Sequence, residues 1–361
     1  MTGVDFGAFR ASGTRSRALP EAEYVVDPKR LEAVRARASL LRWLRTFCEE
    51  RAFLEVQTPL LRVAGEAANV HQYRLEAIGG RTFFLRTDPE EYLKRYLTAG
   101  CDAVYELSLN VRGEAPDANR LHEFTSLECY RRLATLGDMI SLCHEMVGGA
   151  LRALRGSLVT RLHGGMVRWD VKPRVCTFRE LIETHAQIRI EEYPTAASLG
   201  ECVRSRNLWQ GYGDERDRLR GSWLERLLEA CVLPAIEAPT YIVDFPSELG
   251  LSARPRQEDP RVSLRAELYF PGGWELAHLY ENLTEAGPLR ERLAERRRRR
   301  VVNGYPDVAL DEGLLGSAEL GMPPMAGLAI GVDRLLMVVL GEGRVGQGLL
   351  FAREGFEESL P

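Results

Sequence analysis

The chain has 361 residues, of which 45% are hydrophobic and 28% charged, a composition typical of a globular protein and not of a disordered or fibrous one. The formal net charge of −4 excludes a general basic field for nucleic acid. The sequence contains no run of about 20 apolar residues, which excludes a membrane-spanning helix.

The seven cysteines are dispersed singly, without a Cys-x-x-Cys pair. Their odd number and their spacing disfavour a disulfide framework and a zinc site, so a reducing, cytoplasmic location fits best. The first 25 residues show no periodicity and no apolar segment of a signal peptide. We expect a loosely ordered tail there.

The predicted elements begin with an amphipathic helix over 28–50, where apolar residues recur at intervals of three and four. A short strand over 53–56 follows and is stopped by a proline. A strand over 81–86 then precedes a helix over 89–99. Pro89 suits the first position of that helix, and Asp88 can cap it.

Two alternating segments, 103–111 and 123–131, are predicted to pair as a hairpin with a long loop. A second amphipathic helix is expected over 137–155. The region from about 165 to 235 is charged and helix-leaning, with a break at 209–211. We expect an inserted helical subdomain there.

Three strands are predicted over 241–245, 266–270 and 274–280, and the glycine-opened apolar run 327–340 indicates a strand-to-helix junction. The strands cluster without a βαβ rhythm, and the phosphate-binding patterns Gly-x-Gly-x-x-Gly and Gly-x₄-Gly-Lys-[Ser/Thr] are absent. The expected class is therefore α+β, an antiparallel sheet with helices on one side.

Five consecutive arginines at 296–300 form the one marked charge run. A solvated face of a helix is the favoured interpretation. A patch for RNA or for an acidic protein partner is the alternative.

The hairpin carries a pattern suited to a nucleotide. By the period of two, Arg112 and Glu114 share one face of their strand, and Phe124 and Tyr130 share one face of the return strand. A guanidinium offers a forked donor to phosphate, a carboxylate can accept from an exocyclic amine, and an aromatic ring can stack on a base. A surface ion pair beside core aromatics would produce the same pattern.

Two further groups extend this pattern. Arg334 follows Gly327 and Gly331 at the start of an apolar helix, where it is either a second cation for the nucleotide or a surface residue with a buried stem. Glu267 and Glu275 lie on successive strands and could hold Mg²⁺ on ATP phosphates, or could be separate exposed acids.

In order and spacing these segments resemble the three signature motifs of class II aminoacyl-tRNA synthetases, in particular the lysyl-tRNA synthetase branch. FLEVQTP at 53–59 is similar to motif 1, Arg112 to Glu114 with 123–125 to motif 2, and GLAIGVDR at 327–334 to motif 3. The segment LRTDPEEYLKR at 85–95 is similar to the one that precedes motif 2. The resemblance covers about 26–355 and implies that 26–361 is a synthetase-like catalytic domain, an antiparallel sheet flanked by helices.

The resemblance implies that an amino acid carboxylate attacks the α-phosphorus of ATP and releases pyrophosphate. Arg112 would hold the α-phosphate, Glu114 the adenine amine, and Phe124 with Arg334 the two ring faces. The residues so implied for ATP are Arg112, Glu114, Arg120, Phe124 and Arg334, with Arg112 and Arg334 as the catalytic pair. Glu267 and Glu275 would bind Mg²⁺. Those implied for the amino acid are Glu90 at its α-amine and Glu128, Tyr130, His278, Tyr280 and Asn282 around its side chain.

The sequence departs from the family in informative places. Motif 1 begins near residue 31, so we expect no anticodon-reading OB-fold, as in the stand-alone ligases that attach β-lysine to elongation factor P. Arg120 stands where that group has histidine, and one extra residue separates Glu267 from Glu275.

The segment ELAHLYENLTE at 275–285 differs most from its family counterpart, ELANGYHELTD. His278 replaces an asparagine, Leu279 a glycine, and Asn282 the acid that grips the distal ammonium of lysine. A buried ammonium without an acid partner costs several kcal/mol, so we expect a substrate other than lysine. A slip in register that turned Glu281 to this face would reverse that expectation.

The resemblance leaves the acceptor open among a protein lysine, a small molecule or carrier, and tRNA, and implies a homodimer through motif 1. The alternative is a non-catalytic paralog that serves as an amino acid sensor or partner-binding module. Such a paralog would usually lose Arg112, Glu275 or Arg334, and all three are present.

Overall fold

The computed structural model describes residues 28–63, 65, 70–77, 79–115, 117, 120–162, 165–209, 218–341, 344–346 and 348–349. The tail predicted at 1–25 lies outside these residues. None of the helices in the described part of the chain is long and apolar enough to cross a membrane. All seven cysteine side chains are unpaired.

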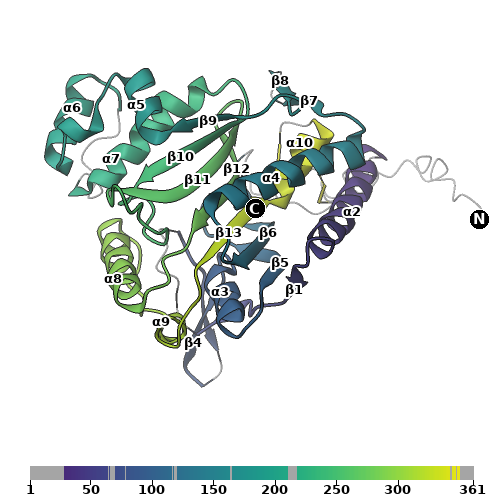
Figure 1. The fold of residues 1–361 in the computed structure, drawn as a ribbon, viewed down its shortest axis with the longest axis horizontal. Coiled ribbons are helices and arrows are strands. Elements are labelled where there is room, and N and C mark those ends of the chain that lie inside the picture. Colours follow the sequence, from purple (N-terminus) through teal and green to yellow (C-terminus); the bar gives the residue numbers. More distant parts are fainter. Residues whose placement is uncertain are drawn as a thin grey trace, which may run out of the picture.

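Within the described residues, one sheet of eight strands dominates the fold (Figure 1). Its order is β1 (Leu54–Glu55), β5 (Ala103–Val111), β6 (Glu123–Arg132), β13 (Met325–Gly331), β12 (Trp274–Glu281), β11 (Val262–Phe270), β10 (Thr240–Pro246) and β9 (Arg174–Thr177). The six central strands pair antiparallel. The edge strands β1 and β9 lie parallel to their neighbours, so the predicted antiparallel sheet is confirmed in its centre.

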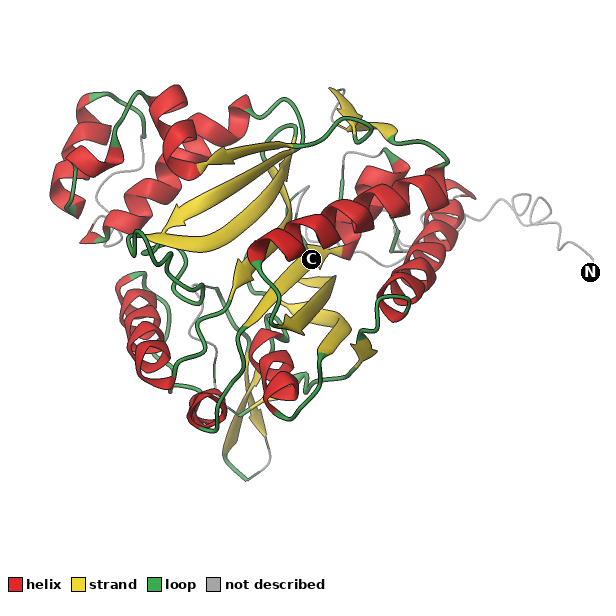
Figure 2. Cartoon of the chain, viewed as in Figure 1, coloured by secondary structure: helices red, strands yellow, loops and turns green. Residues whose placement is uncertain are grey.

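One face of the sheet is apolar and packs against three helices (Figure 2). These are α2 (Pro28–Glu49), α4 (Leu136–Ala150) and α10 (Val332–Leu340). Cys129, Leu328 and Leu279 stand in register on β6, β13 and β12 and are fully buried in this core. Because side chains alternate along a strand, their sequence neighbours point to the opposite face.

Among the described residues, helices cover the opposite face at its two ends, so the expectation of helices on one side is wrong. At the β10 end, α5 (Phe178–Ala186), α6 (Ala196–Ser205) and α7 (Arg220–Leu227) share a second core with Ile242 and Tyr269. At the β5 end, α3 (Glu90–Thr98), α8 (Ala286–Val302) and α9 (Glu312–Glu319) share a third core with Val104 and Tyr130. The polar centre of this face lies between the two groups of helices.

The region predicted to be helix-leaning, about 165–235, is helical only from Phe178 onward. Before that point it contains β8 (Gly165–Arg168), which pairs with β7 (Val159–Leu162), and the edge strand β9. Of the predicted break at 209–211, residues 210 and 211 lie outside the described residues. Short π or 3-10 turns extend α4 and α7 and precede α6.

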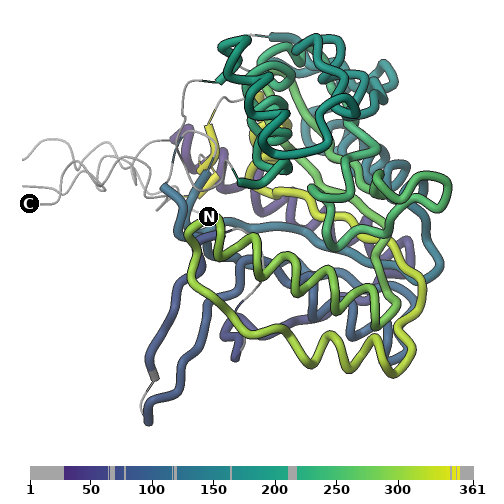
Figure 3. Tube along the Cα trace, turned by 90° about the vertical axis from the view of Figure 1, so that its left-hand side faces the viewer, coloured from purple at the N-terminus to yellow at the C-terminus, as the bar shows by residue number. Residues whose placement is uncertain are grey.

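A separate three-stranded sheet contains β2 (Leu61–Arg62), β4 (Arg81–Leu85) and β3 (Arg74–Ala77). Strands β3 and β4 project from the body of the molecule (Figure 3). This sheet leads into α3, where Pro89 occupies the cap position and not the predicted first helical position. The Asp88 carboxylate accepts a hydrogen bond from the backbone N–H of Glu90 at 3.2 Å, but Asp88 is not the predicted cap residue, because it precedes Pro89, which occupies that position.

The arginine run lies on α8, but it does not form the solvated helix face that the sequence favoured. Arg300 is 1% exposed and donates to the carbonyl of Val70. Arg296 donates to Ser252 Oγ at 2.8 Å. Arg298 retains a largely exposed side chain, and it pairs with a glutamate one turn earlier. Since the guanidinium groups turn inward or pair locally, the run does not present a continuous basic surface.

Candidate active site

A row of functional side chains crosses the polar face of the sheet. The register aligns Glu128 on β6 with Ala329 on β13, Ala329 with His278 on β12, and His278 with Glu267 on β11. Residues in register point to the same face. The small Ala329 therefore leaves space between Glu128 and the pair His278 and Glu267.

A second row runs beside the first, through Tyr130, Gly327, Tyr280 and Arg265. A Cβ on Gly327 would lie 2.2 Å from Cε1 of Tyr130, so the tyrosine ring occupies the place of the missing side chain. At Gly331 no atom comes nearer than 3.6 Å to an added Cβ, so a close approach does not explain that glycine.

The hairpin end brings Arg112 and Phe124 together. Cζ of Arg112 lies 5.0 Å from the ring centroid of Phe124, and the backbone N–H of Arg112 donates to the carbonyl of His122 at 2.8 Å. The Glu114 carboxylate accepts from the backbone N–H of His71 at 3.0 Å. Arg120 is exposed in the loop.

Arg334 lies in the first turn of α10 and donates to the backbone carbonyl of Glu275. Burial lowers the pKa of Arg334; the Glu275 carboxylate opposes this, and the nearby Arg120 and Arg112 add to the lowering. The charges of Arg112 and Arg120 thus act on Arg334, and a polyanion such as a triphosphate would relieve this repulsion.

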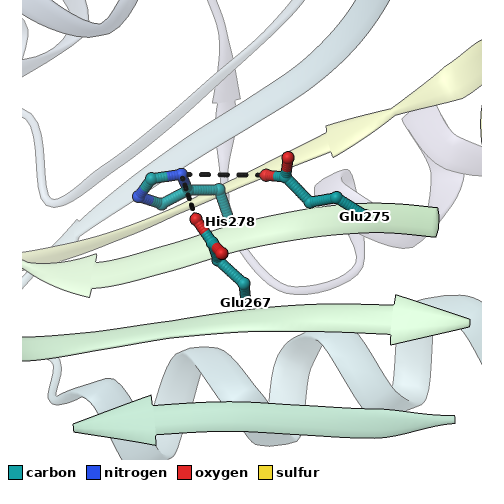
Figure 4. Close-up of side chains that lie close together, drawn as sticks. All are labelled: Glu267, Glu275 and His278. Atoms are coloured by element: carbon teal, nitrogen blue, oxygen red, sulfur yellow. Dashed lines mark ion pairs between the residues drawn. The ribbon is translucent and has the colours of Figure 1, made fainter. Parts of the chain in front are cut away.

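Glu267, Glu275 and His278 point toward one another from two adjacent strands (Figure 4). Nδ1 of His278 lies 3.6 Å from Oε1 of Glu267 and 3.9 Å from Oε1 of Glu275. One donor atom from each residue lies within 4.8 Å of the others. The extra residue between Glu267 and Glu275 therefore does not separate them. Two convergent carboxylates and an imidazole are a donor set that fits a divalent cation.

The pKa values of Glu267, Glu275 and His278 are shifted in different directions. Burial and the charge of Glu267 raise the pKa of Glu275, which Arg334 opposes. Burial alone would raise the pKa of Glu267, but the charge of Arg265 lowers it below its ordinary value. Burial and Arg265 lower the pKa of His278 to about 4, so its imidazole is neutral near pH 7.

The predicted amino acid half of the site adjoins this group. Glu90 is in the first turn of α3, and the buried Lys94 one turn later donates to its Oε1. Burial would raise the pKa of Glu90, but Lys94 and Arg296 lower it to about 2. The Lys94 ammonium lies 5.5 Å from the ring centroid of Tyr280. Glu90 is thus an ionised carboxylate whose charge two cations already balance.

Glu128 and Asn282 are both buried, at 4% and 2% exposure. Ser126 Oγ donates to Glu128 at 3.2 Å. Burial, together with Asp88 and Glu90, raises the pKa of Glu128 well above its ordinary value, which favours a neutral carboxyl group. Neither Oδ1 nor Nδ2 of Asn282 has a hydrogen-bond partner among the described residues.

The structure adds three residues that sequence reasoning missed: Lys94, Arg265 and Arg296. Lys94 follows Glu90 by four positions on a helix, a spacing that brings side chains together. Arg265 precedes Glu267 by two positions on a strand, and a period-two search around Glu267 would have found it. Arg296 was hidden inside the arginine run.

Comparison with known proteins places this geometry in context. Residues 22–355 match the family model described as tRNA synthetases class II (D, K and N). The lysine–tRNA ligase of Pelotomaculum thermopropionicum is 30% identical over 341 residues, covering 91% of this chain and 65% of the relative. The lysine–tRNA ligase of Moorella thermoacetica is 31% identical over 336 residues, covering 91% of this chain and 66% of the relative. The chain thus spans less than two thirds of the length of these relatives.

Proposed function

Because the chain belongs to the class II tRNA synthetases of the D, K and N group, we propose that it activates an amino acid as its adenylate and transfers it to an acceptor. The observations that carry this proposal are the contact of Arg334 with Glu275 and the charges of Arg112 and Arg120 that act on Arg334, beside the cluster of Glu267, Glu275 and His278. Cations that could bind a triphosphate and acids that could bind a divalent ion thereby lie beside the residues proposed to hold the amino acid.

In the proposed reaction, a carboxylate oxygen of the amino acid forms a bond to the α-phosphorus of ATP, and the bond from that phosphorus to pyrophosphate breaks. No proton transfer is needed. Arg112 would contact both the α-phosphate and the incoming carboxylate, and Arg334 would cover the adenine ring opposite Phe124. Glu114 would accept from the adenine amine, and Arg120 would pair with the terminal phosphate. Positioning and charge neutralisation account for the acceleration.

Glu267 and Glu275 would hold Mg²⁺, since their carboxylate oxygens converge in the structure. When bound, Mg²⁺ would neutralise charge on the phosphates and so favour departure of pyrophosphate. The chain's own part is to keep Glu267 ionised: Arg265 pairs with it, and Tyr269 Oη donates to its Oε2 at 2.7 Å.

We further propose that the substrate has a neutral polar side chain and is not lysine. The Asn282 amide is buried and lacks protein partners among the described residues, and a buried unsatisfied amide costs about 1–3 kcal/mol. A substrate group that both donates and accepts would satisfy it. Glu128 favours its neutral form, and Glu90 is already balanced by Lys94 and Arg296, so this pocket offers little net negative charge to a distal ammonium.

As the acceptor of the activated amino acid we propose first a protein lysine, as in the elongation factor P β-lysine ligases. A small molecule or carrier, or tRNA, is the alternative acceptor. The helical segment α5 to α7 is proposed as an insertion in the catalytic domain, because its helices share a core of their own.

A homodimer through motif 1 is supported by exposed apolar side chains in and near motif 1: Leu54 is 56% exposed, Leu61 49% and Val63 77%. Sedimentation as a monomer at micromolar concentration would contradict the dimer.

The proposal is tested by ATP–pyrophosphate exchange with Mg²⁺ across a panel of α- and β-amino acids. We expect exchange with a neutral polar member, lost in Arg112→Ala and Glu275→Ala and kept in Arg298→Ala, a control that removes a largely exposed arginine. Exchange with no amino acid would contradict adenylation. In that case saturable amino acid binding without exchange would favour the alternative, a sensor.

A further inference from the structure

We propose that His278 is a third protein ligand of the cation at Glu267 and Glu275, so that this site prefers Mn²⁺ or Co²⁺ to Mg²⁺. The inference deepens the proposed function, since it concerns the cation that would accompany ATP. It is nevertheless independent of catalysis, because binding of the cation alone requires neither ATP nor an amino acid.

The separations between donor atoms favour a shared ion over hydrogen bonds. Nδ1 of His278 is 3.6 Å from Glu267 Oε1 and 3.9 Å from Glu275 Oε1, which is too long for a hydrogen bond to either. Donors bound about 2.1 Å from one ion lie roughly 3.4 Å apart at a tetrahedral angle. The observed distances are close to that value, and small side-chain movements would bring all three donor atoms within bonding distance of one ion.

The backbone explains why these three residues can meet. Glu275 and His278 are three positions apart, and in a regular strand they would point to opposite faces. The pairing of β11 with β12 shifts register between Leu268 and Tyr269, which leaves Leu276 as an extra residue opposite β11. This bulge turns Glu275 back to the face of His278. Leu276 and the next residue, Ala277, both face the apolar core, as the bulge requires.

The surroundings of the cluster resemble those of a metal site. Glu267 is 4% exposed and oriented by Arg265 and by the Tyr269 hydroxyl, which leaves its second lone pair on Oε1 for a ligand interaction. The His278 side chain is 32% exposed. Part of the coordination shell therefore remains open to water or phosphate oxygens.

The selectivity follows from the donor types. Mg²⁺ takes oxygen ligands and retains its waters, whereas imidazole suits first-row transition ions and strengthens their binding in the order Mn²⁺, Fe²⁺, Co²⁺. Replacing His278 by asparagine would return the site to oxygen donors. The expected effect is a loss of preference between ions and not a loss of the site.

The test is a metal titration of the full chain, free of any affinity tag, in the absence of ATP. Free Mn²⁺ is followed by its paramagnetic resonance signal, Co²⁺ by its visible absorption, and Mg²⁺ by competition with Mn²⁺. The variants are His278→Ala and His278→Asn, with His185→Ala as control, because His185 is exposed on α5 away from the cluster. Circular dichroism melts confirm that each variant is folded.

We expect one Mn²⁺ site in the wild-type protein, at least tenfold tighter than for Mg²⁺. Both His278 variants should weaken Mn²⁺ and Co²⁺ binding at least tenfold and Mg²⁺ less than threefold, while His185→Ala should match the wild type. Equal Mn²⁺ affinity in folded His278→Ala, or several weak sites unaffected by it, would overturn the inference. If the protein catalyses ATP–pyrophosphate exchange but the His278 variants keep the metal preference of the wild type, this inference is wrong and the proposed function is not affected. If His278 contributes to metal binding but no amino acid supports ATP–pyrophosphate exchange, the proposed adenylation is wrong and this inference is not affected.

Discussion

The carboxylate of Asp333 accepts a hydrogen bond from the backbone N–H of Thr125 at 2.8 Å. Arg37 on α2 donates to the other oxygen of Asp333 and to Thr125 Oγ1, both at 2.7 Å. Arg334 follows Asp333 in the sequence, and Phe124 precedes Thr125. Arg334 and Phe124 are the two residues proposed to cover the faces of adenine. The contacts among Arg37, Thr125 and Asp333 thus help to fix the separation of Arg334 and Phe124.

Asp333→Ala should therefore lower the free energy of unfolding by about 3 kcal/mol, because it leaves the Arg37 charge without its buried partner. ATP affinity should fall as well, since Arg334 and Phe124 lose their fixed spacing. Urea unfolding and ATP titration measure the two effects. Asp307→Ala, which breaks an exposed pair with Arg297, is the control and should cost under about 1 kcal/mol. Equal effects of the two changes would contradict the role of Asp333.

Gly327→Ala should destabilise the protein by about 2 kcal/mol and reduce adenylation, because the new methyl group displaces the ring of Tyr130. Thermal unfolding and exchange kinetics measure this. Gly316→Ala on α9 is the matched control: no atom lies within 4 Å of its added Cβ, so it should leave stability unchanged or raise it by up to about 1 kcal/mol. Wild-type behaviour of Gly327→Ala would show that the tyrosine ring can move freely.

Glu90 should contribute a pH-dependent part of stability. Its pKa is about 2 in the folded protein, lowered by Lys94 and Arg296 against the effect of burial, and about 4.3 when unfolded. The lowered value means that the contribution is present above pH ~4.3 and is lost as the pH falls toward 2. Urea unfolding between pH 3 and pH 6 should show a smaller loss in Glu90→Gln than in the wild type. Parallel curves for the two proteins would contradict the balanced-charge environment.

Asn282→Asp should create activity toward lysine. A carboxylate at this position would pair with a distal ammonium, and a charge-assisted hydrogen bond contributes about 1.5–3 kcal/mol, or roughly 10- to 100-fold in affinity. Lysine-dependent exchange should rise by at least tenfold relative to the neutral substrate. Asn303→Asp at the C-terminal cap of α8 is the control. No change in the substrate ratio would place Asn282 outside the side-chain pocket.

Much of the fold follows from local periodicity. The pairing of 103–111 with 123–131 needs only the period of two, and the structure contains it. The membership of the family followed from the order of such segments. Parallel edge strands and helices on the second face depend on contacts between distant segments, which local periodicity does not specify.

The inward turn of Arg296 and Arg300 could not be read from a run of five identical residues, because burial of each depends on what α8 packs against. The meeting of Glu275 and His278 depends on the bulge at Leu276, whereas a regular strand would separate them. The unpartnered amide of Asn282 is likewise a property of the packed structure. Sequence comparison identified the position, and the structure shows its burial.

Isotope transfer tests the central claim most directly. The best amino acid from the exchange panel, labelled with ¹⁸O in its carboxylate, is incubated with the full chain, ATP and hydroxylamine as acceptor, and the products are weighed by mass spectrometry. Attack by the carboxylate on the α-phosphorus predicts AMP that carries one ¹⁸O atom, with unlabelled pyrophosphate. Label in phosphate or pyrophosphate, or AMP without label, would contradict activation through an adenylate.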